Sequence, residues 1–167
     1  MNTLYLLRHA KAGWALPGMR DFDRPLEESG IRDAEALGRA MQEQDYIPSM
    51  TICSTALRAR QTLEAVAGQT DTGRVVFTER LYHDDAAGYL AVISENGGKG
   101  SLLVVGHNPM IEDLAEAHAP SGDADALATL RAGFPTCGLA VIDFPVSLAV
   151  ASLGAGSLRA FLAPGDM

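Results

Sequence analysis

Two histidines and two arginines each follow an apolar run of this chain, and these residue types together suit phosphoryl chemistry. Arg8 and His9 come directly after a near-continuous apolar stretch, and His107 comes after the most apolar stretch of the chain. Arg58 lies just beyond a third apolar stretch, residues 50–54. A neutral imidazole can attack phosphorus, while guanidinium groups and a second imidazole can neutralise the equatorial phosphoryl oxygens. We therefore expect these four side chains to form an anion site.

Attack by an imidazole sets conditions on its surroundings. The ring must be neutral, and the nitrogen that does not attack needs a hydrogen-bond acceptor, for which we expect a backbone carbonyl. Arg58 falls in the first turn of an expected helix, where a cation costs roughly 0.3–1 kcal/mol. An anion bound between that helix N-terminus and the guanidinium would offset the cost. The alternative is that Arg58 extends into water and binds nothing.

The elements that must position these residues can be read from the hydrophobic pattern. Continuous rather than alternating hydrophobicity predicts strands buried on both faces, as in a parallel sheet covered by helices. Strands are expected over residues 4–10, 50–54, 74–81, 101–105, 138–144 and 157–162. Helices are expected over residues 27–44, 55–68, 85–95 and 109–119, with a loop and a short helix in 120–137. The alternation predicts one domain, residues 1–167, with an α/β fold: a three-layer α/β/α sandwich around a mostly parallel central sheet.

Ligand sites in open α/β sheets gather at the carboxyl ends of the strands. If the strands that precede His9, Arg58 and His107 are parallel neighbours, the three side chains converge on one rim of the sheet. Helix caps are expected at Asp84 and at Asn108, with Pro109 at the first helical position.

Composition excludes several classes of protein. The chain has 167 residues, of which 47% are hydrophobic and 20% charged, so a folded globular domain is expected. A net charge of −8 argues against a nucleic-acid partner. No apolar stretch is long enough for a membrane span and no secretory signal is recognisable, so we expect a cytoplasmic protein with no membrane partner. The two cysteines indicate neither a disulfide framework nor a metal cluster.

Three short motifs carry a resemblance to a known family. Residues 7–10 (LRHA) resemble the RHG/RHA signature of the histidine phosphatase (phosphoglycerate mutase-like) superfamily. Residues 54–62 (STALRARQT) resemble its S-x-x-x-R-A-x-Q-T segment, and residues 106–109 (GHNP) match its GHNP element. Within the superfamily, the chain looks most like the SixA-type phosphohistidine phosphatases. This likeness rests on the RHAK sequence of residues 8–11, the DRPL sequence of residues 23–26 and the short chain. The motifs occur in the family's order and span nearly the whole chain.

The resemblance implies a role for each site residue. His9 would be the nucleophile that forms a phosphohistidine intermediate, and Arg8, Arg58 and His107 would form the catalytic phosphate pocket. Arg24 would contribute to substrate binding from the loop before the first helix. The scheme needs no metal and no cofactor. The implied partner is a protein that carries phosphohistidine, with a small phosphorylated metabolite as the alternative substrate.

The sequence departs from the family pattern at two places. Many members carry a Glu or Asp general acid in a large insertion, but here the segment between the third and fourth strands is short. Glu79, Asp84 and Asp85 lie nearby in sequence, and none can be assigned as that acid. A missing acid fits an easily departing imidazole better than a sugar or serine leaving group, and a short chain without a lid implies an open site. Glu27 stands where relatives often have Thr or Ser, which affects only a helix cap.

Two other functions remain open. One is a metal-dependent hydrolase in which His9, His107 and a carboxylate such as Asp21 bind zinc, although the zinc-enzyme motifs are missing. The other is a non-catalytic phosphate-binding module, which would have little reason to keep the nucleophile. A nucleotide-binding fold is disfavoured because neither G-x-G-x-x-G nor a P-loop follows any strand. His83 and His118 are expected to have surface or packing roles.

Overall fold

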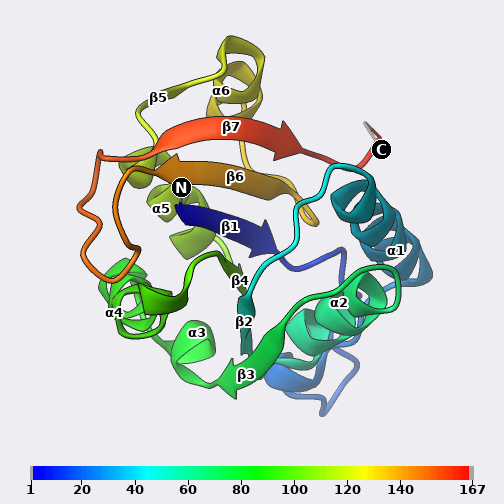
Figure 1. Cartoon of the computed structure of the whole chain (residues 1–167). Helices are drawn as coiled ribbons and strands as arrows, with labels where there is room; N and C mark the ends of the chain where they lie inside the picture. Colours follow the sequence, from blue (N-terminus) through cyan, green and yellow to red (C-terminus); the bar gives the residue numbers. More distant parts are fainter. Residues whose placement is uncertain (1, 166–167) are drawn as a thin grey trace.

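The computed structural model describes residues 2–165; Met1, Asp166 and Met167 of the predicted domain lie outside the described residues. One seven-stranded sheet runs through the molecule, in the order β3-β2-β4-β1-β6-β7-β5 (Figure 1). The strands are β1 (Asn2–Arg8), β2 (Met50–Ser54), β3 (Arg74–Thr78), β4 (Leu102–Gly106), β5 (Ser121–Gly122), β6 (Leu139–Phe144) and β7 (Ser157–Leu162). β6 is antiparallel to both its neighbours, β1 and β7, while the β3-β2-β4-β1 half is parallel throughout. The expected mostly parallel sheet is therefore confirmed.

Helices cover both faces of this sheet, which makes the expected three layers. The helices are α1 (Glu28–Glu43), α2 (Leu57–Ala67), α3 (Arg80–His83), α4 (Ala86–Asn96), α5 (Met110–His118) and α6 (Ala124–Arg131), with short 3-10 turns η1 (Asp21–Asp23) and η2 (Gly97–Lys99). α1 and α2 pack together on one face, and α3 to α6 lie on the other (Figure 1). Among residues 2–165 no helix is both long and apolar enough to cross a membrane.

β1 shows why its sequence is continuously apolar. Leu4 and Leu6 belong to the core beneath α3 to α6, whereas Tyr5 and Leu7 belong to the core beneath α1 and α2. Successive side chains of a strand point to opposite faces, so a strand between two helical layers needs apolar residues at every position. The run ends at Arg8, where the strand leaves the two cores.

The third strand is shorter than expected. Thr78 ends β3, and residues 80–83 form α3 instead of continuing the strand to residue 81. Leu81 is completely buried in the core beneath α3 to α6, and its carbonyl accepts a hydrogen bond from the Tyr89 hydroxyl. This tertiary contact, which has no local sequence signal, favours a helical turn over further strand.

The helix caps also differ from expectation by one residue. Asp85, not Asp84, caps α4, since its carboxylate accepts a hydrogen bond from the Gly88 amide at 3.1 Å. Pro109, not Asn108, occupies the N-cap position of α5, after a cis peptide bond. The Asn108 amide oxygen still accepts from the Glu112 backbone N–H at 3.2 Å, so this side chain does satisfy a first-turn donor.

Candidate active site

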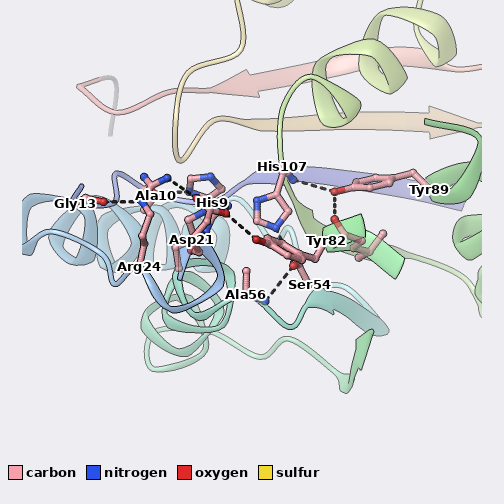
Figure 2. Close-up of polar contacts among 12 residues, drawn as sticks. His9, Ala10, Gly13, Asp21, Arg24, Ser54, Ala56, Tyr82, Tyr89 and His107 are labelled. Carbon is pink, nitrogen blue, oxygen red and sulfur yellow. Dashed lines mark hydrogen bonds and ion pairs between the residues drawn. The ribbon is translucent and has the colours of Figure 1, made fainter. Parts of the chain in front are cut away.

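Three neighbouring strands of the parallel half end at one rim of the sheet, as expected. β4 pairs with both β1 and β2, and Arg8 is in register with Gly106. The next residues along the chain, His9 and His107, therefore lie side by side, with ring centroids 5.2 Å apart (Figure 2). Ser54 at the end of β2 lies next to His107 in the same view.

His9 is held in one tautomer by its own backbone. Its Nδ1 lies 2.7 Å from the carbonyl oxygen of Ala10, and a carbonyl can only accept, so Nδ1 carries the proton and Nε2 keeps the lone pair. The Ala10 amide donates to the Thr62 hydroxyl at 2.9 Å, and that hydroxyl donates to the Arg58 carbonyl at 2.7 Å. These bonds tie the β1 end to the first turns of α2 and fix the imidazole relative to Arg58.

The electrostatic surroundings keep His9 neutral. Burial is the main factor that lowers its pKa to about 4, and nearby Arg58 and Arg8 add to this effect against the opposing hydrogen bond to Ala10. The ring is therefore uncharged at neutral pH, which is the form that can attack phosphorus.

His107 is equally buried and is positioned from two sides. Its Nε2 lies 2.8 Å from the Ser54 hydroxyl, and its backbone N–H donates to the Tyr89 hydroxyl at 3.1 Å. A Cβ on Gly106 would lie 2.7 Å from that same hydroxyl, so glycine is needed here for the approach of Tyr89. Burial, and then the proximity of His9 and Arg58, lowers the pKa of His107 to about 3.

Arg8 and His107 each bury a polar atom that lacks a protein partner. The Arg8 guanidinium donates from one terminal nitrogen to the Phe134 carbonyl at 2.9 Å. Its Nε and the Nδ1 of His107 are buried without a hydrogen-bond partner within the described part of the chain. A buried unsatisfied polar atom costs roughly 1–3 kcal/mol. The unpaired Nε–H of Arg8 is a donor, the kind of group that an oxygen of a bound anion satisfies.

The other two arginines meet at Asp21 in the 3-10 turn η1. Arg58, only 7% exposed, donates to the Asp21 carbonyl at 2.8 Å and to its carboxylate Oδ2 at 3.1 Å. Arg24 donates to Asp21 Oδ1 at 3.0 Å and, through Nε, to the Gly13 carbonyl at 2.8 Å. The loop thus brings Arg24 to the arginine that follows β2, and Arg58 is an engaged side chain rather than one extended into water.

Two further residues contact the predicted side chains: Asp21, which the sequence offered only as a zinc ligand in the metal-dependent alternative, and Tyr82, which it did not offer. The Tyr82 hydroxyl donates to Asp21 Oδ2 at 2.8 Å, and the Tyr82 ring meets the His107 ring edge-on at 5.6 Å (Figure 2). Tyr82 lies in α3, which begins where the sequence predicted a continuing strand. The contact of Asp21 with Arg58 had no local signal, because the two residues lie 37 positions apart.

Asp21 is ionised at neutral pH. Partial burial raises its pKa, but hydrogen bonds from Tyr82 and Arg24 and the charge of Arg58 outweigh this and bring the pKa to about 2. A carboxyl group in this state accepts hydrogen bonds and has no proton to donate.

The remaining candidates lie outside this cluster. His118 is buried against Phe144, as the expected packing role requires. His83 is exposed beside Tyr82. Across residues 2–165, His, Cys, Asp and Glu side chains form no group of three or more arranged to hold a metal ion.

Comparisons with known proteins give the family of this chain. Residues 4–84 match the model of the histidine phosphatase superfamily (branch 1). An uncharacterized protein of Mycobacterium tuberculosis is 36% identical over 161 residues, which cover 95% of this chain and 99% of the relative. The chain belongs to the histidine phosphatase superfamily.

Within this superfamily the chain is SixA-like. It is 39% identical to the SixA protein of Agrobacterium tumefaciens, a candidate phosphohistidine phosphatase, with a TM-score of 0.82 over 98% of this chain and 99% of that one. The corresponding SixA candidate from Nakamurella multipartitia is 30% identical, with a TM-score of 0.85 over 98% and 96% of the two chains. The predicted family and the predicted fold class are thereby confirmed. The catalytic roles of Arg8, His9, Arg58 and His107 and the binding role of Arg24 stay predictions.

Proposed function

We propose that this superfamily member is a phosphatase that removes the phosphoryl group from phosphohistidine on a protein, through a covalent intermediate on His9. The observation that carries the proposal is the Nδ1–H bond from His9 to the Ala10 carbonyl. It leaves the Nε2 lone pair of a neutral ring among three arginines and a second histidine.

The proposed reaction has two steps. The Nε2 lone pair of His9 attacks phosphorus, and the bond from phosphorus to the leaving nitrogen breaks with its electron pair going to that nitrogen. The other nitrogen of the leaving ring already carries a proton, so the ring departs as neutral imidazole. A water molecule then attacks the phosphorylated His9, whose Nε2 recovers its lone pair as phosphate forms. Arg8, Arg58 and His107 would stabilise the phosphoryl oxygens in both steps, because charge spreads over them in the transition state.

The choice of a phosphohistidine substrate on a protein rests on the chemistry of the leaving group and on the exposed apolar residues beside the site. The ionised Asp21 cannot protonate an alkoxide, whereas an imidazole can depart as a neutral ring. The SixA protein with 39% identity is a candidate phosphohistidine phosphatase. The loop beside Arg24 presents Trp14 at 91% and Leu16 at 66% exposure, and such apolar side chains suit contact with a protein surface.

The test is phosphate release from a histidine-phosphorylated protein in excess chelator. We expect turnover by the native chain and its loss in His9→Ala. The control variant is His118→Phe, which removes another buried imidazole outside the cluster, and it should keep the native rate.

Other results would contradict the proposal in different ways. Release from a small phosphorylated metabolite but not from the phosphoprotein would retain the mechanism and overturn the substrate. Activity that chelator abolishes would favour a metal-dependent hydrolase. Inactivity toward both substrates would favour a non-catalytic phosphate-binding module.

A further inference from the structure

A separate cavity of about 300 Å³ opens next to the candidate phosphate pocket. Its lining residues come from the η1 loop and from the β3–α3 segment: Arg20, Asp21, Phe22, Glu79, Tyr82 and His83. Two of them also contact the active-site cluster. Asp21 is bonded to Arg58, and the Tyr82 ring lies against His107 and 5.8 Å from the Arg58 guanidinium carbon. A group attached to a phosphoryl bound by Arg58 would therefore extend toward this cavity.

The walls of the cavity are aromatic. The Phe22 and Tyr82 rings meet edge to face with centroids 5.1 Å apart, and the Tyr82 and His83 rings do so at 4.9 Å. Rings arranged in this way accept a further flat ring by stacking or edge contact. The volume suits a small ring rather than a large cofactor. Asp21 and His83 are exposed at the rim, so the ring can be presented by another molecule's surface.

The polar groups of the cavity favour a hydrogen-bond donor. Asp21 and Glu79 supply carboxylates, while the one arginine of the lining, Arg20, is paired with Asp23 at 2.9 Å. Asp21 is itself paired with Arg24 and Arg58, so selection here depends on hydrogen bonding and not on net charge. The carboxylate oxygens of Asp21 and Glu79 are acceptors, which suit the N–H of a nitrogen heterocycle.

Asp21 has room for one more hydrogen bond. Oδ2 accepts from Arg58 and Tyr82, but Oδ1 accepts only from Arg24 among the residues that the structure describes. Each carboxylate oxygen has about two lone-pair positions, so Oδ1 can take a further N–H donor.

We propose that this cavity is the leaving-group subsite and takes the imidazole ring of a phosphohistidine, whose distal ring N–H donates to Asp21. The proposal rests on the function proposed above and deepens it. Attack by His9 Nε2 breaks the phosphorus–nitrogen bond, and the electron pair returns to the substrate nitrogen. Because the distal nitrogen is already protonated, the ring leaves as neutral imidazole and the protein donates no proton. Asp21 stabilises the protonated form of the leaving ring. With the proton already on the ring, the reaction needs no general acid from the protein.

The experiment compares two substrates in matched variants. The substrates are a histidine-phosphorylated peptide and p-nitrophenyl phosphate, whose leaving group has no ring N–H. Asp21→Asn is expected to lower kcat/KM for the peptide, relative to p-nitrophenyl phosphate, by about 10-fold or more, as for loss of a charge-assisted hydrogen bond. Glu43→Gln removes an exposed carboxylate at the end of α1 that does not line the cavity, so the ratio should stay at its native value.

The outcomes separate this proposal from the function on which it rests. An equal loss on both substrates in Asp21→Asn would show that Asp21 only positions the arginines, which overturns the subsite and leaves the phosphatase intact. Native protein that cleaves p-nitrophenyl phosphate but never the peptide would overturn the subsite and the phosphohistidine substrate together. Native protein inactive toward both would overturn the proposed function itself.

Discussion

The active-site cluster and the His118 site both bury imidazole rings, yet they surround them differently. His118 is 2% exposed at the end of α5 and meets the Phe144 ring edge-on at 5.3 Å. Its two ring nitrogens are buried without a hydrogen-bond partner among residues 2–165. His9 is buried to a similar degree, but its Nδ1 is bonded to the Ala10 carbonyl.

The difference shows what distinguishes a reactive histidine from a packed one. Burial alone lowers the pKa of His118, and it is also the main factor for His9 and His107. A lowered pKa therefore does not identify a functional imidazole. The active-site pair is distinguished by bonds that fix ring orientation and by the surrounding arginines.

Among variants that keep His9, replacement of the Arg58 guanidinium should produce the largest effect in the active-site region. Arg58→Lys keeps the charge but cannot hold Asp21 at two points and a phosphoryl group at the same time. We expect kcat/KM to fall by about 100-fold, the usual scale for loss of one transition-state donor. Arg60→Lys, two residues along the same helix and exposed, should change kcat/KM less than about twofold. Steady-state kinetics of both variants check this, and equal effects would contradict the special position of Arg58.

The next prediction concerns the pKa of the His9 imidazole, which NMR titration can measure. The imidazole resonances of His9 should titrate with a midpoint near pH 4, far below the ordinary value of about 6.5. A His9 midpoint close to the ordinary value would remove the argument that the nucleophile is neutral through burial.

The smallest expected effect concerns stability at the His118 site. A histidine whose folded-state pKa is lowered binds protons first in the unfolded chain, so its contribution to stability is present above pH about 6.5 and is lost as pH falls. His118→Phe removes this loss. As the pH falls from 6.5 to 5.5, the unfolding free energy of the native chain should fall relative to that of the variant. Urea unfolding at both pH values measures this change, and a constant difference would mean that His118 is not buried as a neutral ring.

Sequence patterns were sufficient to predict the site residues that directly follow a buried strand. The continuous apolar runs before His9 and His107 predict strands buried on both faces, and parallel pairing then places both residues on one rim. A backbone carbonyl was expected as the acceptor for the second ring nitrogen of His9, and the structure shows that it is the carbonyl of the next residue, Ala10. These predictions depend on neighbours in sequence or on strand periodicity.

Contacts between distant segments could not be predicted in this way. Tyr82 reaches Asp21 across 61 residues, and no periodic pattern connects them. The close approach permitted by Gly106 is used by Tyr89, which supports His107 from α4. The buried Leu81 turns the chain into α3 and so places Tyr82 beside the site. Each of these features follows from packing of the whole molecule.

The most direct test of the account is to trap the covalent intermediate. Native protein is mixed with a histidine-phosphorylated peptide, quenched within milliseconds in alkali, and digested for mass spectrometry, since phosphohistidine survives alkali. We predict the added mass of one phosphoryl group on the peptide that contains His9, and its absence in His9→Ala. Turnover without phosphorylated His9, or with the phosphoryl group on His107 instead, would contradict the mechanism.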